Sequence, residues 1–278
     1  MVAFDSLLPE AQRRASQRAA WQDGDAPLPS LYISHGAPPL FEEETWMREL
    51  LGWADRLPIP RGILIVSAHW EAAPLSLSAV NPGNVVYDFG GFDPRYYRMR
   101  YDTPDASGLA AEILGVLPDG VRVHQHASRG LDHGAWVPLK VMYPNADIPV
   151  LQLSLPTDSP TALLSIGRFL RPLRERGILV IGSGFMTHGL PYLTAAMING
   201  AVPQWSRDFD QWATEALQRG DVDELAAYRD RAPGMTYAHP TVEHFTPLFV
   251  TLGAGGTDIT TEIDGYWWGM SRRSLQAG

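Results

Sequence analysis

Short apolar segments bounded by Gly or Pro recur along the chain, at Leu31–Ser34, Gly62–Ala68, Leu75–Ala79, Val121–His124, Ile148–Leu155 and Gly177–Gly182. Because a strand that is buried on both faces is apolar at nearly every position, these segments predict a largely parallel sheet. Between or after them, the apolar spacing and flanking residues predict helices over Glu42–Leu57, Ala106–Leu117, Ala135–Tyr143, Pro160–Arg176, Ser206–Arg219 and Thr241–Leu252. Alternating strands and helices indicate one α/β domain, in which helices flank a central sheet that is mostly parallel or mixed.

The first 29 residues have a different pattern. An Ala-rich helix with several arginines is expected over Leu8–Trp21, and a loose stretch follows it. We therefore expect residues 1–29 to form an N-terminal extension and residues 30–278 to form the catalytic domain. No internal repeat or low-complexity segment is found.

Composition narrows the classes of function. The 278 residues include 45% hydrophobic residues, which is enough for a sizeable core, and the net charge is −9. A negative field repels phosphate backbones and anionic lipid, so neither nucleic acid nor a membrane surface is an expected partner. No apolar run approaches the roughly 20 residues of a membrane span, and the N-terminus lacks the apolar core of a signal peptide. A cytoplasmic location is expected, while the oligomeric state is left unspecified.

The chain contains no cysteine. This excludes disulfides, thiolate nucleophiles, iron–sulfur clusters and Cys-ligated zinc. A bound metal would be held by His, Asp or Glu, which suits zinc or non-haem iron(II).

Histidines stand where the predicted strands end. His35 directly follows Leu31–Ser34, His69 directly follows Gly62–Ala68, and His188 comes shortly after Gly177–Gly182. Two more, His133 and His244, lie in a loop before a predicted helix and near the start of the last predicted helix. Since ligands of open α/β sheets bind at the carboxyl ends of the strands, these five imidazoles predict a metal site.

A single histidine at a strand end is more often structural, so the prediction rests on five of eight histidines lying at strand ends or before helices, three of which, His35, His133 and His188, directly precede a glycine. The other three, His124, His126 and His239, are interpreted as surface, supporting or capping residues. A nucleophile elbow, a phosphate-binding loop and the H-E-x-x-H zinc motif are all missing from the sequence.

Several motifs together resemble the DODA-type extradiol ring-cleaving dioxygenases, the 4,5-DOPA dioxygenase-like members of the class III extradiol superfamily. The matching stretches occur in the family's order over about residues 30–278, and they are Ser34–Pro38, Ser67–Trp70, Asp88–Phe92, Gly130–Trp136, Met142–Pro149, Gly182–Gly184 with His188, and His239–Leu248.

The resemblance implies that His35, His69 and His244 coordinate the metal, with Glu243 as an alternative to His244. It also implies that His133 and His188 face the open coordination positions as acid–base or substrate-orienting groups. The chain has Phe185 and Gly189 where the family usually has asparagines. Two polar amides are therefore expected to be missing beside the pocket, which affects the identity of the substrate more than metal binding.

The implied activity is extradiol cleavage of a catechol ring, DOPA-like or other, by O2. Iron(II) is the expected cofactor, although zinc could occupy the purified protein because zinc binds nitrogen sites more tightly. An imidazole, with an ordinary pKa near 6.5, could accept a catechol proton. Candidates for stacking on the ring or for core packing are Phe89, Phe92, Trp70 and Tyr96, and candidates for meeting a substrate carboxylate or for simple solvation are Arg95 and Arg98.

Two alternatives stay open. A zinc hydrolase could use the same histidines to activate water. A non-catalytic protein could use them to bind a metal or another ligand on the same scaffold.

Overall fold

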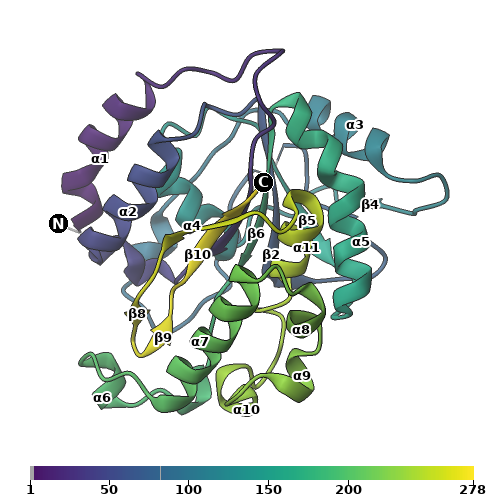
Figure 1. The fold of residues 1–278 in the computed structure, drawn as a ribbon. Helices are drawn as coiled ribbons and strands as arrows, with labels where there is room; N and C mark the ends of the chain where they lie inside the picture. The colour runs from purple at the N-terminus through teal and green to yellow at the C-terminus, as the bar shows by residue number, and fades with distance from the viewer. Residues whose placement is uncertain (1–2, 82) are drawn as a thin grey trace.

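The computed structural model describes residues 3–81 and 83–278. Within this part of the chain one large mixed sheet has the strand order β4-β3-β5-β2-β6-β1-β10-β7, and a small second sheet pairs β8 with β9 (Figure 1). The strands are β1 (Ser30–Ser34), β2 (Gly62–Glu71), β3 (Ser76–Leu77), β4 (His124–Gln125), β5 (Val150–Leu155), β6 (Ile178–Gly184), β7 (Ile259–Ile263), β8 (Tyr266–Trp267), β9 (Met270–Ser271) and β10 (Ser274–Ala277). The predicted α/β fold with a mixed central sheet is confirmed.

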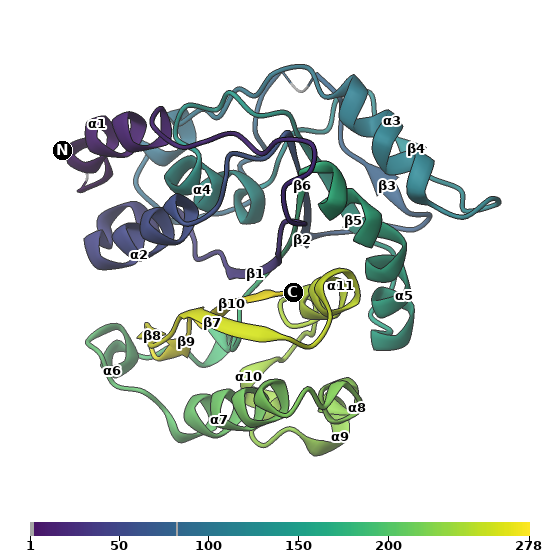
Figure 2. The ribbon, with the colours of Figure 1, turned by 45° about the horizontal axis from the view of Figure 1, so that its top comes forward.

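The helices surround this sheet. They are α1 (Ala3–Ala15), α2 (Glu44–Asp55), α3 (Ser107–Val116), α4 (His133–Met142), α5 (Pro160–Leu170), α6 (Ala195–Ile198), α7 (Gln204–Gln218), α8 (Val222–Ala226), α9 (Tyr228–Arg231), α10 (Met235–Ala238) and α11 (Pro247–Gly255). Helices α1, α2 and α4 lie on one side of the sheet, and α3, α5 and α11 lie on the other (Figure 2). Helix α7 lies beyond them, next to α8–α10 and β9.

The four central strands β5, β2, β6 and β1 run parallel. Their side chains alternate between two cores. In β2, Ile63 and Ile65 join the core under α2 and α4, whereas Leu64 and Val66 join the core under α5 and α11. Both sets are buried, which explains why the strand is apolar at consecutive positions.

The C-terminal strands were not predicted. β10 inserts antiparallel between β1 and β7, so residues near the end of the chain lie beside one of the first strands. β7 is an edge strand with exposed Thr260 and Thr261, and its sequence therefore lacks the apolar pattern of the central strands.

Two further boundaries differ from the prediction. The last long helix begins at Pro247 and not at Thr241, because proline has no N–H to donate within a helix and is best placed in its first turn. Residues 241–246 form turns instead. The strand expected at Val121–His124 is reduced to His124–Gln125 at the sheet edge.

The N-terminal segment packs closely on the rest of the chain. Helix α1 buries Phe4 and Leu7 in the core under α2 and α4. The helix ends at Ala15, earlier than predicted, because the following residues pair with the loop before β2: the Trp21 N–H donates to the Ile59 carbonyl at 2.9 Å.

None of the helices in the described residues combines the length and the apolar character that a bilayer crossing requires.

Candidate metal centre and its cavity

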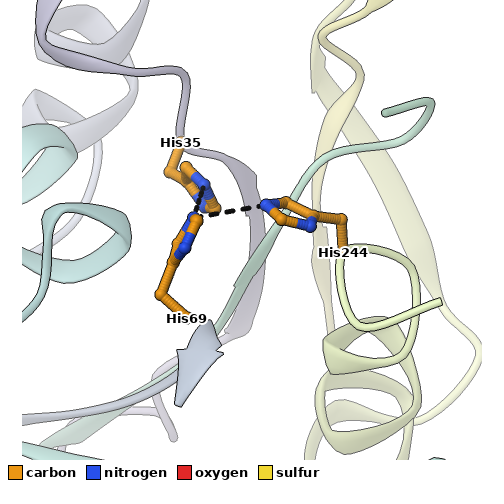
Figure 3. Close-up of side chains that lie close together, drawn as sticks. All are labelled: His35, His69 and His244. Carbon is orange, nitrogen blue, oxygen red and sulfur yellow. Dashed lines mark hydrogen bonds between the residues drawn. The ribbon is translucent and has the colours of Figure 1, made fainter. Parts of the chain in front are cut away.

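Three histidines from distant parts of the sequence point their ring nitrogens at one spot (Figure 3). The Nε2 atom of His69 lies 3.1 Å from Nε2 of His35 and 3.2 Å from Nε2 of His244. His35 and His244 are buried and His69 is partly exposed. The structure thus brings together the three residues that the resemblance implied as ligands.

Local structure explains how each one arrives. His35 follows the last residue of β1, and His69 lies within β2, which extends to Glu71. His244 lies in the turns before α11, and its carbonyl oxygen accepts hydrogen bonds from the Phe185 N–H and the Tyr32 hydroxyl. Gly184 makes this approach possible, since a Cβ at that position would lie 2.0 Å from the His244 carbonyl oxygen.

The outer nitrogens of two of these rings have defined partners. The Ser183 hydroxyl donates to the Gly134 carbonyl, so at 2.9 Å it can only accept from Nδ1 of His35. Nδ1 of His244 lies 2.8 Å from a carboxylate oxygen of Glu243, and an ionised carboxylate only accepts. In both rings the proton therefore stays on Nδ1, and the Nε2 lone pair faces the cluster.

The Nε2 lone pairs of His35 and His244 thus both face Nε2 of His69, and a cation between the three nitrogens would bind all of them. Three nitrogens bound to one ion at about 2.0–2.1 Å, with angles of about 90–109°, lie roughly 2.8–3.4 Å apart. The separations of 3.1 and 3.2 Å fall in that range. The donor set and its spacing fit a divalent metal.

Protonation does not compete with this arrangement. Burial, followed by the charges of neighbouring histidines, holds the pKa of His35 and of His244 well below the ordinary value. Burial likewise lowers the pKa of His69 to about 3. The imidazoles are neutral near pH 7, which is the form that binds metals.

His133 stands beside the cluster as the first residue of α4. Its ring centroid lies 3.9 Å from that of His69, and its Nδ1 atom lies 2.8 Å from Oδ1 of Asp88. The same carboxylate has its second oxygen 3.5 Å from Nδ1 of His69. Burial raises the Asp88 pKa, but hydrogen bonding and charge from His133 and His69 outweigh this effect and hold the pKa below its usual value.

The helix that carries His133 is fixed at its start by a buried network. The Asp132 carboxylate caps α4 by accepting from the Ala135 N–H. It also accepts from the Ser67 hydroxyl at 2.8 Å, and Ser67 in turn accepts from the His69 N–H at 3.2 Å. The positions of His133 and His69 are therefore coupled through hydrogen bonds.

His188 lies on another side of the cluster. Its ring stacks on that of His244 with centroids 3.4 Å apart and planes 12° apart. Burial, more than the neighbouring histidines, lowers the pKa of His188 to about 3.

A cavity of about 250 Å³ opens over these side chains. His35, His69, His133 and His188 form its polar wall together with Asp88. The remaining lining residues are Gly36, Ala37, Phe89, Gly90, Phe92, Phe185, Leu190, Trp267, Trp268 and Met270.

The other predicted residues lie elsewhere. His124 and His126 lie at the sheet edge, with ring centroids 4.6 Å apart, and His239 is buried between Phe209 and Phe245. Of the four aromatic residues proposed to contact a substrate ring, Phe89 and Phe92 line the cavity. Trp70 packs against Arg129 and His126, and Tyr96 is buried beside Glu42.

Ser183 and Asp88 were not selected from the sequence as site residues. Both occur inside the matching stretches Gly182–Gly184 and Asp88–Phe92, which was the available signal. Gly189 was expected beside the pocket, but its backbone packs against Tyr237 and Trp205, and it does not line the cavity.

Known proteins similar to this chain identify its family. Residues 29–272 match the model of the LigB family, described as the catalytic LigB subunit of aromatic ring-opening dioxygenase. The chain belongs to this family. The resemblance to DODA-type extradiol dioxygenases is thereby confirmed, and membership indicates an oxygenase-type, metal-dependent enzyme that acts on a small aromatic compound with O2.

Among LigB-family relatives, a "4,5-DOPA dioxygenase extradiol" of Beta vulgaris is 39% identical over 241 residues, which cover 84% of this chain and 89% of that protein. The protein of the same name from Escherichia coli is 34% identical, with 90% and 95% covered. The crystal structure of an uncharacterized protein from E. coli K12 superimposes with a TM-score of 0.75 at 31% identity, covering 90% of this chain and all of that one.

Proposed function

We propose that this chain is an iron(II)-dependent extradiol dioxygenase that opens the ring of a catechol. The observation that supports this most is the convergence of three Nε2 atoms, in which His69 lies 3.1 Å from His35 and 3.2 Å from His244, with the ring protons of His35 and His244 held on the outer nitrogens.

In this proposal His35, His69 and His244 hold the metal. Glu243 is assigned to the outer nitrogen of His244, where its carboxylate orients the ring and increases its basicity. Three protein ligands leave positions for a substrate and O2. Zinc would fit the same nitrogens and could fill the site during purification.

Bound there, iron(II) supplies a Lewis acid that lowers the pKa of the catechol hydroxyls, and it supplies the electronic means for O2 to react with the ring. The overall reaction breaks the carbon–carbon bond beside the diol. Both atoms of O2 enter the product, one in an aldehyde and one in a carboxylate, and O2 is the oxidant.

His133 is assigned as the group that accepts and returns the substrate proton. Asp88 keeps a proton on Nδ1 of His133, so Nε2 is the nitrogen free to accept one. His188, stacked flat on His244, lines the cavity and is assigned to orienting the substrate. Phe89 and Phe92 supply apolar surface for the ring.

The test is to purify the protein without oxygen, load it with iron(II), and add L-DOPA and a panel of simple catechols. Oxygen uptake and a yellow semialdehyde product are expected. Absence of turnover across the whole panel would overturn the dioxygenase assignment, and hydrolysis without oxygen uptake would favour a zinc hydrolase.

The ligand set has its own test. His69→Ala should lose stoichiometric metal, whereas His126→Ala, which alters a histidine at the sheet edge, should retain it. Unchanged metal content in His69→Ala would show that the ligand set is wrong.

A further inference from the structure

The cavity wall away from the histidines is apolar. It consists of Phe92, Leu190, Trp267, Trp268 and Met270, and Phe185 joins it to the histidines, with its ring centroid 6.4 Å from that of His35 and 6.2 Å from that of His188. When the two hydroxyls of a catechol face the histidines, the opposite edge of its ring faces this wall. Any substituent on that edge must therefore lie against hydrocarbon and aromatic surface.

The β8–β9 hairpin builds much of the wall. Its turn places Trp268 and Gly269 at φ 49° and 71°, the left-handed conformations that tight hairpins require. The Trp267 and Trp268 rings stack with centroids 4.1 Å apart. The indole N–H of Trp267 donates to Glu43 at 3.0 Å, so this polar atom is already paired.

Among the described residues that line the cavity there is neither lysine nor arginine. Arg95, one of the two candidates for a substrate carboxylate, pairs with Glu42 and stacks on Tyr96 instead. The other, Arg98, is exposed and does not line the cavity.

The charge that does line the cavity is negative. Asp88 accepts from the backbone N–H and from Nδ1 of His133. A substrate carboxylate against the apolar wall would lose water without gaining a partner, and it would also face the field of a chain with net charge −9. An ammonium group against the apolar wall would likewise lose water without a carboxylate beside it, since Asp88 lies on the histidine side of the cavity, next to His133 and His69.

We infer, on the basis of the proposed function, that the preferred substrates are catechols whose ring substituent is uncharged and apolar, in preference to amino-acid or carboxylate-bearing catechols such as L-DOPA. The apolar wall at Leu190, Trp267, Trp268 and Met270 is the specificity-determining surface. Leu190, which is 45% exposed, marks where this surface meets solvent.

The test uses a matched pair of probes, 4-propylcatechol and 3-(3,4-dihydroxyphenyl)propanoate, which differ by a methyl group in place of a carboxylate. For the iron-loaded enzyme we expect kcat/KM to be at least tenfold higher for the propyl compound. The methyl ester of the acid removes the charge and adds only one methyl group, so its kcat/KM should return toward that of the propyl compound.

A gain-of-function variant tests the wall itself. Leu190→Arg should raise kcat/KM for the acid at least tenfold relative to the propyl compound. Leu190→Gln, which is polar but uncharged, should not. Because this side chain is exposed, both variants are expected to fold.

Equal or better use of the acid or of L-DOPA by the native enzyme would overturn the inference. If no catechol is turned over, the proposed function fails separately. Calorimetry of the same probes with metal-loaded protein under anaerobic conditions then still ranks them, and a Kd for the acid as low as that for 4-propylcatechol would overturn the inference on its own.

Discussion

Replacing Ser183 by alanine tests whether hydrogen bonds outside the histidine cluster prepare it for metal. Ser183 is fully buried and lies between Nδ1 of His35 and the Gly134 carbonyl. Without its hydroxyl, the metal-bound form still requires a proton on Nδ1, but that buried N–H has no acceptor. In the metal-free form the proton can move to Nε2. The penalty therefore falls mainly on the metal-bound state.

The size of the effect follows from that difference. A buried N–H without a partner costs about 1–3 kcal/mol. At about 1.4 kcal/mol per factor of ten, metal affinity should fall roughly 5- to 150-fold. This agrees with the 10- to 100-fold losses typical when the outer partner of a metal-binding histidine is removed.

The assay is competition for zinc against a chromophoric chelator, with thermal unfolding as a check that the variant is folded. Ser30→Ala is the matched control. Ser30 is also buried in the sheet, and its hydroxyl donates to the Val180 carbonyl at 3.1 Å and not to a histidine. If folded Ser183→Ala bound zinc within twofold of the native protein, the argument from the Nδ1 proton would be refuted.

Three other predictions follow from the same structure. Asp88→Asn should lower kcat about 100-fold or more and change KM little, because the uncharged amide no longer stabilises a protonated His133 imidazole. Steady-state kinetics of the variant and the native enzyme check this, and an unchanged kcat would contradict it. Burial lowers the pKa of His239 to about 4, against about 6.5 in an unfolded chain, so the unfolded state binds more protons between these two pH values. The metal-free protein, prepared with a chelator, should therefore lose stability as the pH falls from 6.5 to 4. His239→Asn should lose about 3 kcal/mol less over that window in urea unfolding, and equal losses would show that the buried ring is not held neutral. Gly167→Ala places a Cβ 2.3 Å from a carbonyl oxygen of α11 and should cost about 1–3 kcal/mol of unfolding free energy, whereas Gly52→Ala, with nothing within 4 Å, should not destabilise the protein.

The sequence was most informative where burial is complete. In β2 both faces are covered, so every position from Ile63 to Val66 is apolar and the strand could be recognised without knowing its neighbours. The same strands carry His35 and His69 at or near their ends, which made the site predictable as a place on the sheet.

The sequence was least informative about polar side chains that hydrogen-bond to the histidines and orient them. Asp88 and Ser183 resemble ordinary loop and strand residues until their distances to ring nitrogens are known. The edge strand β7 has two consecutive exposed threonines, Thr260 and Thr261, and β10 is recognised through its pairing with β1 and β7. These features depend on contacts between distant segments, which local patterns do not encode.

The spacing of the three histidines in the chain has a consequence for biosynthesis. His244 follows His69 by 175 residues, and its carbonyl must dock on β6 before the ring can face the other two. At about 5–20 residues synthesised per second, the ribosome needs roughly ten seconds or more to make this interval. Of the three proposed ligands, only His35 and His69 have been made during that time, and two imidazoles hold an ion weakly. The choice of metal in the cell is therefore expected to be made after translation, by whichever ion is available to the finished chain.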